Sequence, residues 1–136
     1  MNKIHYSAAG ALIVLIGLYY FLIPNQAVGD EKSIVETTMP ALDDSFDKGA
    51  KLYADNCAQC HGKTLGGVVG NGPPFIHAYY NSGHHGDAAF YRAVSEGVQA
   101  HHWQFGDMPK IELIMRDQAQ LIIEYIRAVQ QANGLH

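Results

Sequence analysis

Hydrophobic and polar positions divide the 136-residue chain into an apolar first segment, a polar second segment and a mostly helical remainder. Residues 4–23 contain no Asp, Glu, Lys or Arg, and about 20 apolar residues are enough for a helix to cross a hydrocarbon core of about 30 Å. Residues 24–44 are acidic and show neither helical nor strand periodicity, which is typical of a solvated linker. The pattern therefore predicts a single transmembrane helix at 4–23, a flexible linker at 24–44 and a compact domain at 45–136.

The first helix of the domain is predicted over residues 46–55, with Ser45 or Asp44 as its cap. Gly49 within it costs about 1 kcal/mol relative to alanine. A glycine in that place lets another helix cross closely, and we expect the last helix to be that partner.

Two further helices follow from apolar residues at helical spacing. One begins at Asp87 and ends at Gly97. The last begins near Asp117, where Gln120 completes a sequence like a capping box, and stops at Gly134. No stretch predicts a strand, so the fold class is mainly α, with short helices and long loops.

The motif Cys57-Ala58-Gln59-Cys60-His61 contains the only two cysteines of the chain. Two thiols at this spacing, followed directly by a histidine, form the signature of covalent c-type haem attachment. Each thiol adds to one haem vinyl group, and His61 can then offer an imidazole nitrogen to the iron. The motif therefore predicts one covalently bound haem c, held by Cys57 and Cys60.

Two competing interpretations of the cysteine pair are weaker. A zinc site needs four ligands, and no second pair follows at a zinc-type spacing, although the pairs His84-His85 and His101-His102 keep this interpretation open. A thioredoxin-like redox pair needs a βαβ context, and the glycine-rich sequence around Cys57 does not provide one.

The loop at 62–74 is rich in glycine and contains Pro73 and Pro74, which excludes regular structure. A proline keeps its backbone carbonyl although it lacks an N–H group. The Pro73 carbonyl is therefore suited to accept the free ring N–H of His61 and to orient the imidazole. A plain surface turn is the competing interpretation of this loop.

Met108 is our leading candidate for the second axial iron ligand. It lies between Gly106 and Pro109, in a loop that can hold a thioether in place, and a methionine ligand raises the reduction potential. Met115 is a weaker rival that we expect in the core. The iron could instead take a histidine ligand or keep an open site; the histidines after the motif are His77, His84, His85, His101 and His102.

Three aromatic residues could belong to the haem environment. Trp103 and the pair Tyr79-Tyr80 carry groups that can hydrogen-bond a haem propionate, although they could equally be core aromatics. The histidine clusters also admit copper binding as a minor hypothesis.

With these residues identified, the segment 45–136 resembles a class I c-type cytochrome. The resemblance lies in four features: the first helix with Gly49 and Tyr53, the haem motif, the turn at 72–74, and the Met108 loop before a last helix with Tyr125. It implies a cytochrome c fold around one haem, with His61 and Met108 as axial ligands and a first and last helix that cross at a glycine–aromatic contact. It also implies that the carbonyl of Pro73, or alternatively of Pro74, holds the histidine.

The resemblance and the apolar first segment together imply an electron carrier rather than an enzyme. Its expected partners are redox proteins or membrane respiratory complexes that donate electrons or act as terminal oxidase or reductase. Lys3 and the α-amino group precede the span, whereas the acidic stretch that follows it contains Lys32 as its one basic residue. The positive-inside rule therefore places the amino terminus in the cytoplasm and the haem domain on the periplasmic side of a bacterial inner membrane. A cleaved signal, with its best site after Ala27, is the competing interpretation of the first segment.

Two further classes of function remain open from the sequence. A haem sensor or peroxidase would need an open iron site. A cytochrome subunit built into a larger membrane oxidoreductase could pack its anchor among other helices, and Gly10 and Gly17 are small residues that suit such packing.

Overall fold

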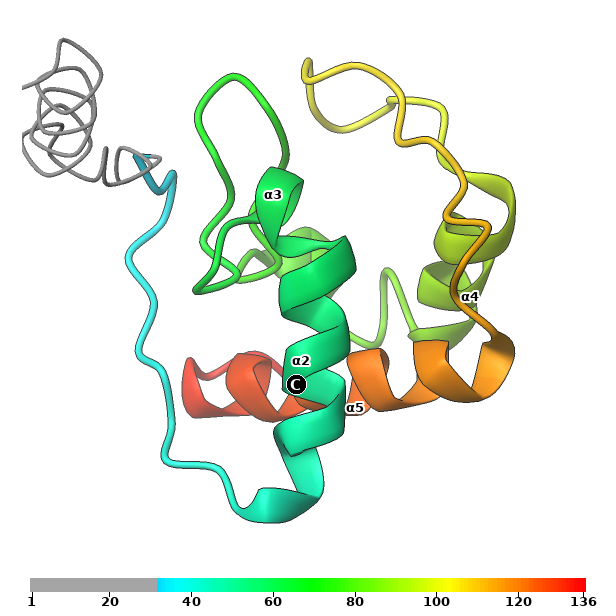
Figure 1. Ribbon diagram of the computed structural model, residues 1–136. Helices are drawn as coiled ribbons and strands as arrows, with labels where there is room; N and C mark the ends of the chain where they lie inside the picture. The colour runs from blue at the N-terminus through cyan, green and yellow to red at the C-terminus, as the bar shows by residue number, and fades with distance from the viewer. Residues whose placement is uncertain (1–31) are drawn as a thin grey trace, which may run out of the picture. The chain divides into compact units, whose positions relative to one another are not determined.

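The computed structural model describes residues 32–136, which form a helical unit without any strand (Figure 1). This confirms the mainly α fold class predicted for the domain. Within this part of the chain the α-helices are α2 (Asp47–Asn56), α3 (Ala58–His61), α4 (Asp87–Glu96) and α5 (Arg116–Ala132), and the 3₁₀ helices are η1 (Asp44–Phe46) and η2 (Ala78–Tyr80).

The helix ends agree with the prediction in part. Helix α4 starts at Asp87 and ends before Gly97, as predicted. The first helical stretch is capped by Asp43, not by Ser45 or Asp44, because the Asp43 carboxylate accepts the Ser45 N–H at 2.8 Å in front of η1.

The last helix begins one residue earlier than predicted. Helix α5 starts at Arg116, and the side chain of Gln118 accepts the Met115 N–H at 2.9 Å. Gln120 was predicted to complete the capping box, but its amide instead donates to Glu124 one turn further along the helix.

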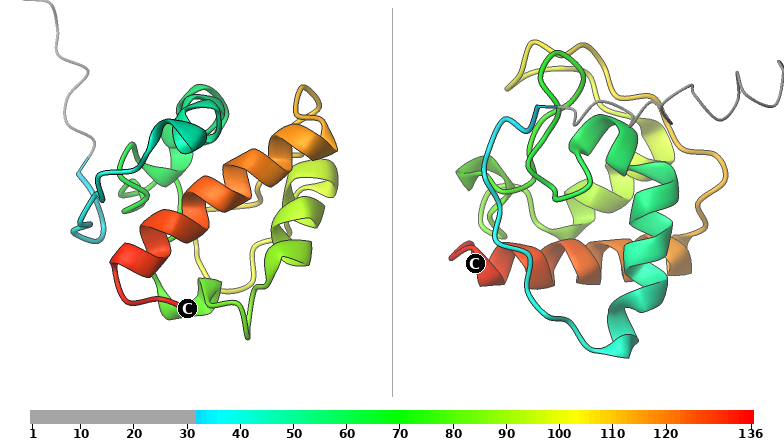
Figure 2. Two further views of the ribbon diagram at one scale, coloured as in Figure 1. Left: turned by 90° about the horizontal axis from the view of Figure 1, so that it is seen from below. Right: turned by 60° about the vertical axis from the view of Figure 1, so that its left-hand side comes forward.

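Helices α2 and α5 cross each other (Figures 1 and 2). Gly49 lies at this contact, which confirms the predicted reason for a glycine inside a helix. A Cβ atom on Gly49 would lie 3.0 Å from the Leu121 carbonyl carbon and 3.2 Å from the Tyr125 Cβ. Beside this contact, the rings of Tyr53 and Tyr125 pack with their centroids 5.5 Å apart. The rest of the core continues from there; its buried members are Ala58, Leu65, Phe75, Ile76, Phe90, Ile122, Ile123, Ile126 and Val129.

The segment before the first helix is bonded to the domain. The N–H groups of Ile34 and Val35 both donate to the Gly66 carbonyl, at 3.0 and 2.9 Å. The Asn133 side chain exchanges two hydrogen bonds of 2.9 Å with the backbone of Thr38. These residues belong to the predicted linker at 24–44, so its part from Lys32 to Thr38 differs from a freely solvated chain.

The predicted anchor at 4–23 and the first part of the predicted linker lie outside the described residues. Within residues 32–136, no helix is long and apolar enough to cross a membrane.

Candidate haem site

Cys57 lies at the junction between α2 and α3, and Cys60 lies within α3. The Cys57 N–H still donates to Tyr53 O in α2, at 2.8 Å, while the Cys57 carbonyl accepts the His61 N–H of α3 at 2.9 Å. Cys57 is half-buried and Cys60 is exposed. Burial, with a smaller contribution from Cys60, raises the pKa of the Cys57 thiol to about 12. The single turn of α3 thus presents two thiols and one imidazole from five consecutive residues.

The His61 ring is buried and held in one orientation. Its Nδ1 lies 2.9 Å from the Pro73 carbonyl oxygen, which can only accept a hydrogen, so the Nδ1–H donates. Its face stacks on Phe75, with the ring centroids 4.2 Å apart. Burial lowers the pKa of His61, and the Pro73 bond partly opposes this. The ring is therefore a neutral imidazole whose other nitrogen, Nε2, keeps its lone pair for a metal.

The loop that supplies Pro73 passes directly against the motif. A Cβ atom on Gly72 would lie 2.8 Å from the Cys60 carbonyl carbon and 3.0 Å from the Cys60 Cβ, so a side chain there would displace the loop. The contact between His61 and Pro73 confirms the predicted bond, with Pro73 rather than Pro74 as its acceptor.

Met108 ends an irregular loop that is closed by a backbone bridge. Val98 and Met108 exchange two N–H to carbonyl hydrogen bonds, each of 2.9 Å. Inside the loop, the Asp107 carboxylate accepts the Ala100 N–H at 2.8 Å. These bonds fix the backbone at Met108. The Met108 side chain is half-buried and takes part in none of them.

Trp103 lies in the same loop and has an unusual polar atom. Its Nε1–H is buried and donates no hydrogen bond of normal geometry to the protein. Buried polar groups are almost always paired, so this N–H is free to pair with a group that binds beside it. Burial raises the pKa of the nearby Tyr80 hydroxyl to about 12, and the Trp103 indole partly offsets the shift.

The residues present fit a haem. The two thiols, the neutral imidazole with a free Nε2 and the unpaired Trp103 N–H, which suits a propionate carboxylate, all match the predicted group. Tyr80 packs against the core, whereas Tyr79 is 37% exposed.

Met115 does not lie in the core, where we expected it. Its side chain is 67% exposed at the start of α5, because the residue serves as the helix cap instead of turning inward.

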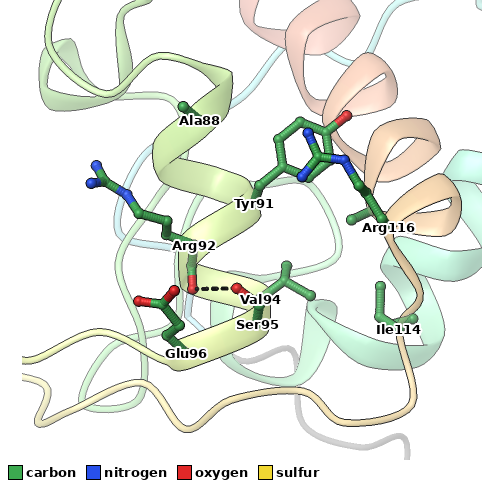
Figure 3. Close-up of a pocket in the computed structure, with 9 residues that line it drawn as sticks. Ala88, Tyr91, Arg92, Val94, Ser95, Glu96, Ile114 and Arg116 are labelled. Carbon is green, nitrogen blue, oxygen red and sulfur yellow. Dashed lines mark hydrogen bonds between the residues drawn. The ribbon is translucent and has the colours of Figure 1, made fainter.

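A pocket of about 600 Å³ lies between α4 and the segment that leads into α5. Figure 3 shows Tyr91 and Arg116 lying against one another in the lining of this pocket. The Arg116 guanidinium carbon is 4.4 Å from the centroid of the Tyr91 ring. No residue that we predicted for the haem site lines this pocket, so the pocket is separate from that site.

Phe75 was not predicted as a residue of the site. The sequence did contain a signal for it: a loop that places Pro73 against His61 also brings Phe75, two residues later, past the same ring.

The Cytochrome c family model matches residues 46–130, which is more than half of the chain. No curated protein matches the sequence. The chain belongs to the cytochrome c family. Its members hold haem c covalently, and Cys57 and Cys60 of this chain fit the attachment motif. The family supports a haem-based role in electron transfer.

Proposed function

We propose that the chain is a membrane-tethered monohaem cytochrome that carries single electrons between respiratory donors and a terminal oxidase or reductase. Bound haem c supplies an iron that accepts and releases one electron. The observation that carries the proposal is the His61 imidazole, which is buried, neutral and fixed by the Pro73 carbonyl with Nε2 free.

In this proposal His61 and Met108 would be the two protein ligands of the haem iron. The Pro73 carbonyl increases the basicity of His61 and keeps its ring from rotating. The bridge between Val98 and Met108 fixes where the methionine side chain starts. Trp103 donates its unpaired N–H to a haem propionate. Since neither ligand has to leave for an electron to pass, the site suits a carrier rather than an enzyme that binds substrate at iron.

The ligand assignment is tested by Met108→Ala, with Met115→Ala as the matched control. Loss of a thioether ligand should change the haem absorption spectrum, lower the reduction potential and let the ferrous protein bind carbon monoxide. Met115→Ala should leave all three unchanged, because that side chain is exposed.

A Met108→Ala protein with an unchanged six-coordinate spectrum would show that the ligand is another residue. Carbon monoxide binding by the unaltered ferrous protein would instead indicate an open iron site, as in a sensor or peroxidase.

The tether is proposed from the uncharged residues 4–23. We propose that they anchor the chain in a bacterial inner membrane, with the haem domain on the periplasmic side. Fractionation of cells that express the full chain should place its haem in the membrane fraction, and deletion of residues 4–23 behind a cleavable signal should move it to the periplasm. Recovery of the full chain in the soluble fraction would contradict the tether but not electron transfer.

A further inference from the structure

Three histidines outside the haem site come together from two separate segments. The ligand nitrogens of His84, His85 and His102 all lie within 4.8 Å of one another. Among residues 32–136 this is the one group of histidine, cysteine or acidic side chains close enough to share a metal ion. His84 and His102 are exposed and His85 is half-buried, so the group is open to an ion from solution.

The first two histidines belong to a turn with a fixed backbone. The N–H groups of His84 and His85 both donate to the Asn81 carbonyl at 2.9 Å. From α5, the Arg127 guanidinium donates to the His85 carbonyl at 2.8 Å and to the Asp87 carboxylate at 2.9 Å. The turn is thus bonded to the longest helix of the domain.

The third histidine lies in the loop that ends at Met108. The His102 ring stacks on Tyr79, with the centroids 4.3 Å apart and the planes 22° apart. This contact places the His102 Nε2 only 3.1 Å from the His84 Nε2. The loop and the turn meet through these two nitrogens.

The spacing suits a metal ion. Two nitrogens on one tetrahedral metal, each at 2.0–2.1 Å, lie about 3.3 Å apart, close to the 3.1 Å between His84 and His102. Partial desolvation, together with the neighbouring imidazoles, lowers the pKa of His85 and of His102. Neutral imidazoles are the form that binds a metal, and imidazole nitrogen suits Zn²⁺ and Cu²⁺.

We propose that His84, His85 and His102 form a second metal site, which binds one divalent transition-metal ion of the Zn²⁺ or Cu²⁺ class and joins the turn at 81–85 to the loop at 98–108. A direct hydrogen bond between the Nε2 atoms of His84 and His102 would link only these two side chains, whereas a metal ion would link all three histidines. Chelators can remove such an ion. The order of the loop at 98–108 therefore depends on whether the metal is bound.

The site is tested by Zn²⁺ titration of the full-length holoprotein, produced without a histidine tag and solubilised in detergent. Calorimetry should give one binding site. Loss of an outer partner of a metal ligand typically weakens affinity about 10- to 100-fold, and loss of a ligand should cost no less. We therefore expect His84→Ala and His102→Ala each to weaken Zn²⁺ binding at least about tenfold.

His136→Ala is the matched control, because it removes an exposed histidine that does not belong to the group. Its Zn²⁺ affinity should equal that of the unaltered protein. With Cu²⁺ in place of Zn²⁺, electron paramagnetic resonance should show nitrogen ligands that disappear in His84→Ala.

Equal Zn²⁺ affinity in the two cluster variants and the unaltered protein would overturn the proposal, as would an equal loss in the control. Hydrogen exchange gives a second readout: Zn²⁺ should slow exchange in residues 99–107 of the unaltered protein and not in His102→Ala. The haem spectrum and potential stay as the readout of the proposed function, so failure of one proposal leaves the other standing.

Discussion

The crossing of α2 and α5 gives the sharpest stability prediction. In Gly49→Ala the added methyl group meets the Leu121 backbone carbonyl, with the carbonyl carbon at 3.0 Å and the Tyr125 Cβ at 3.2 Å. A backbone group inside a helix cannot turn aside as a flexible side chain can. The two helices must therefore separate, and the packed pair Tyr53 and Tyr125 separates with them.

The expected change in the free energy of unfolding of Gly49→Ala combines two opposing effects. Overpacking typically destabilises by about 1–3 kcal/mol, and the rigid neighbour places Gly49→Ala at the upper end of that range. Alanine regains about 1 kcal/mol over glycine in a helix. The net loss is about 2 kcal/mol, which corresponds to a fall in Tm of about 8–16 °C for a domain of 60–100 residues.

The assay is thermal and denaturant unfolding of the full-length holoprotein, followed by far-ultraviolet circular dichroism. Gly83→Ala is the matched control, because a Cβ atom there meets nothing within 4 Å. Its stability should change by less than about 0.5 kcal/mol. If Gly49→Ala were as stable as the unaltered protein, or more stable, the close crossing would not be the reason for glycine at this position.

Two further substitutions test buried polar contacts by the same unfolding assay. Tyr53→Phe leaves the Gly62 carbonyl without the 2.7 Å bond from the tyrosine hydroxyl and should destabilise by about 1–3 kcal/mol. Burial also raises the pKa of Tyr53 in the folded state. As the pH rises, the unfolded chain therefore loses this proton first, near pH 10, and the stability falls above that value. Tyr53→Phe should reduce this fall, and an unchanged pH profile of stability would contradict the explanation. Arg127→Met removes the donor to Tyr80 O at 2.6 Å and to His85 O at 2.8 Å and should cost about 2–4 kcal/mol. Arg127→Lys should recover only part of this loss, since a lysine lacks the planar fork, and full recovery would refute the role of the fork.

The parts of the fold that depend on local pattern could be predicted from sequence. A glycine inside a helix predicted the crossing at Gly49, and Gly97 predicted the end of α4. The start of α5 was misjudged because Gln118 and Gln120 both offer an amide near the helix start, and only the backbone shows which one accepts the Met115 N–H.

Contacts between distant segments were beyond the reach of the sequence. Residues 32–38 contain few apolar side chains and resemble a linker, but they bond through backbone N–H groups, for which no side-chain pattern exists. In the sequence, Arg127 is an ordinary polar position of an amphipathic helix. Only the structure shows that its guanidinium donates to Tyr80, His85 and Asp87. The haem motif was easier to recognise, because Cys57, Cys60 and His61 fall within five consecutive residues.

The bridge between Val98 and Met108 has an evolutionary consequence. Val98 and Met108, the two ends of the loop, are bonded to each other. The length or composition of the loop between them can therefore change without shifting the backbone at Met108. Insertions in closed surface loops cost little free energy. Exposed positions of this loop, such as His102, can therefore change while the backbone at Met108 stays in place.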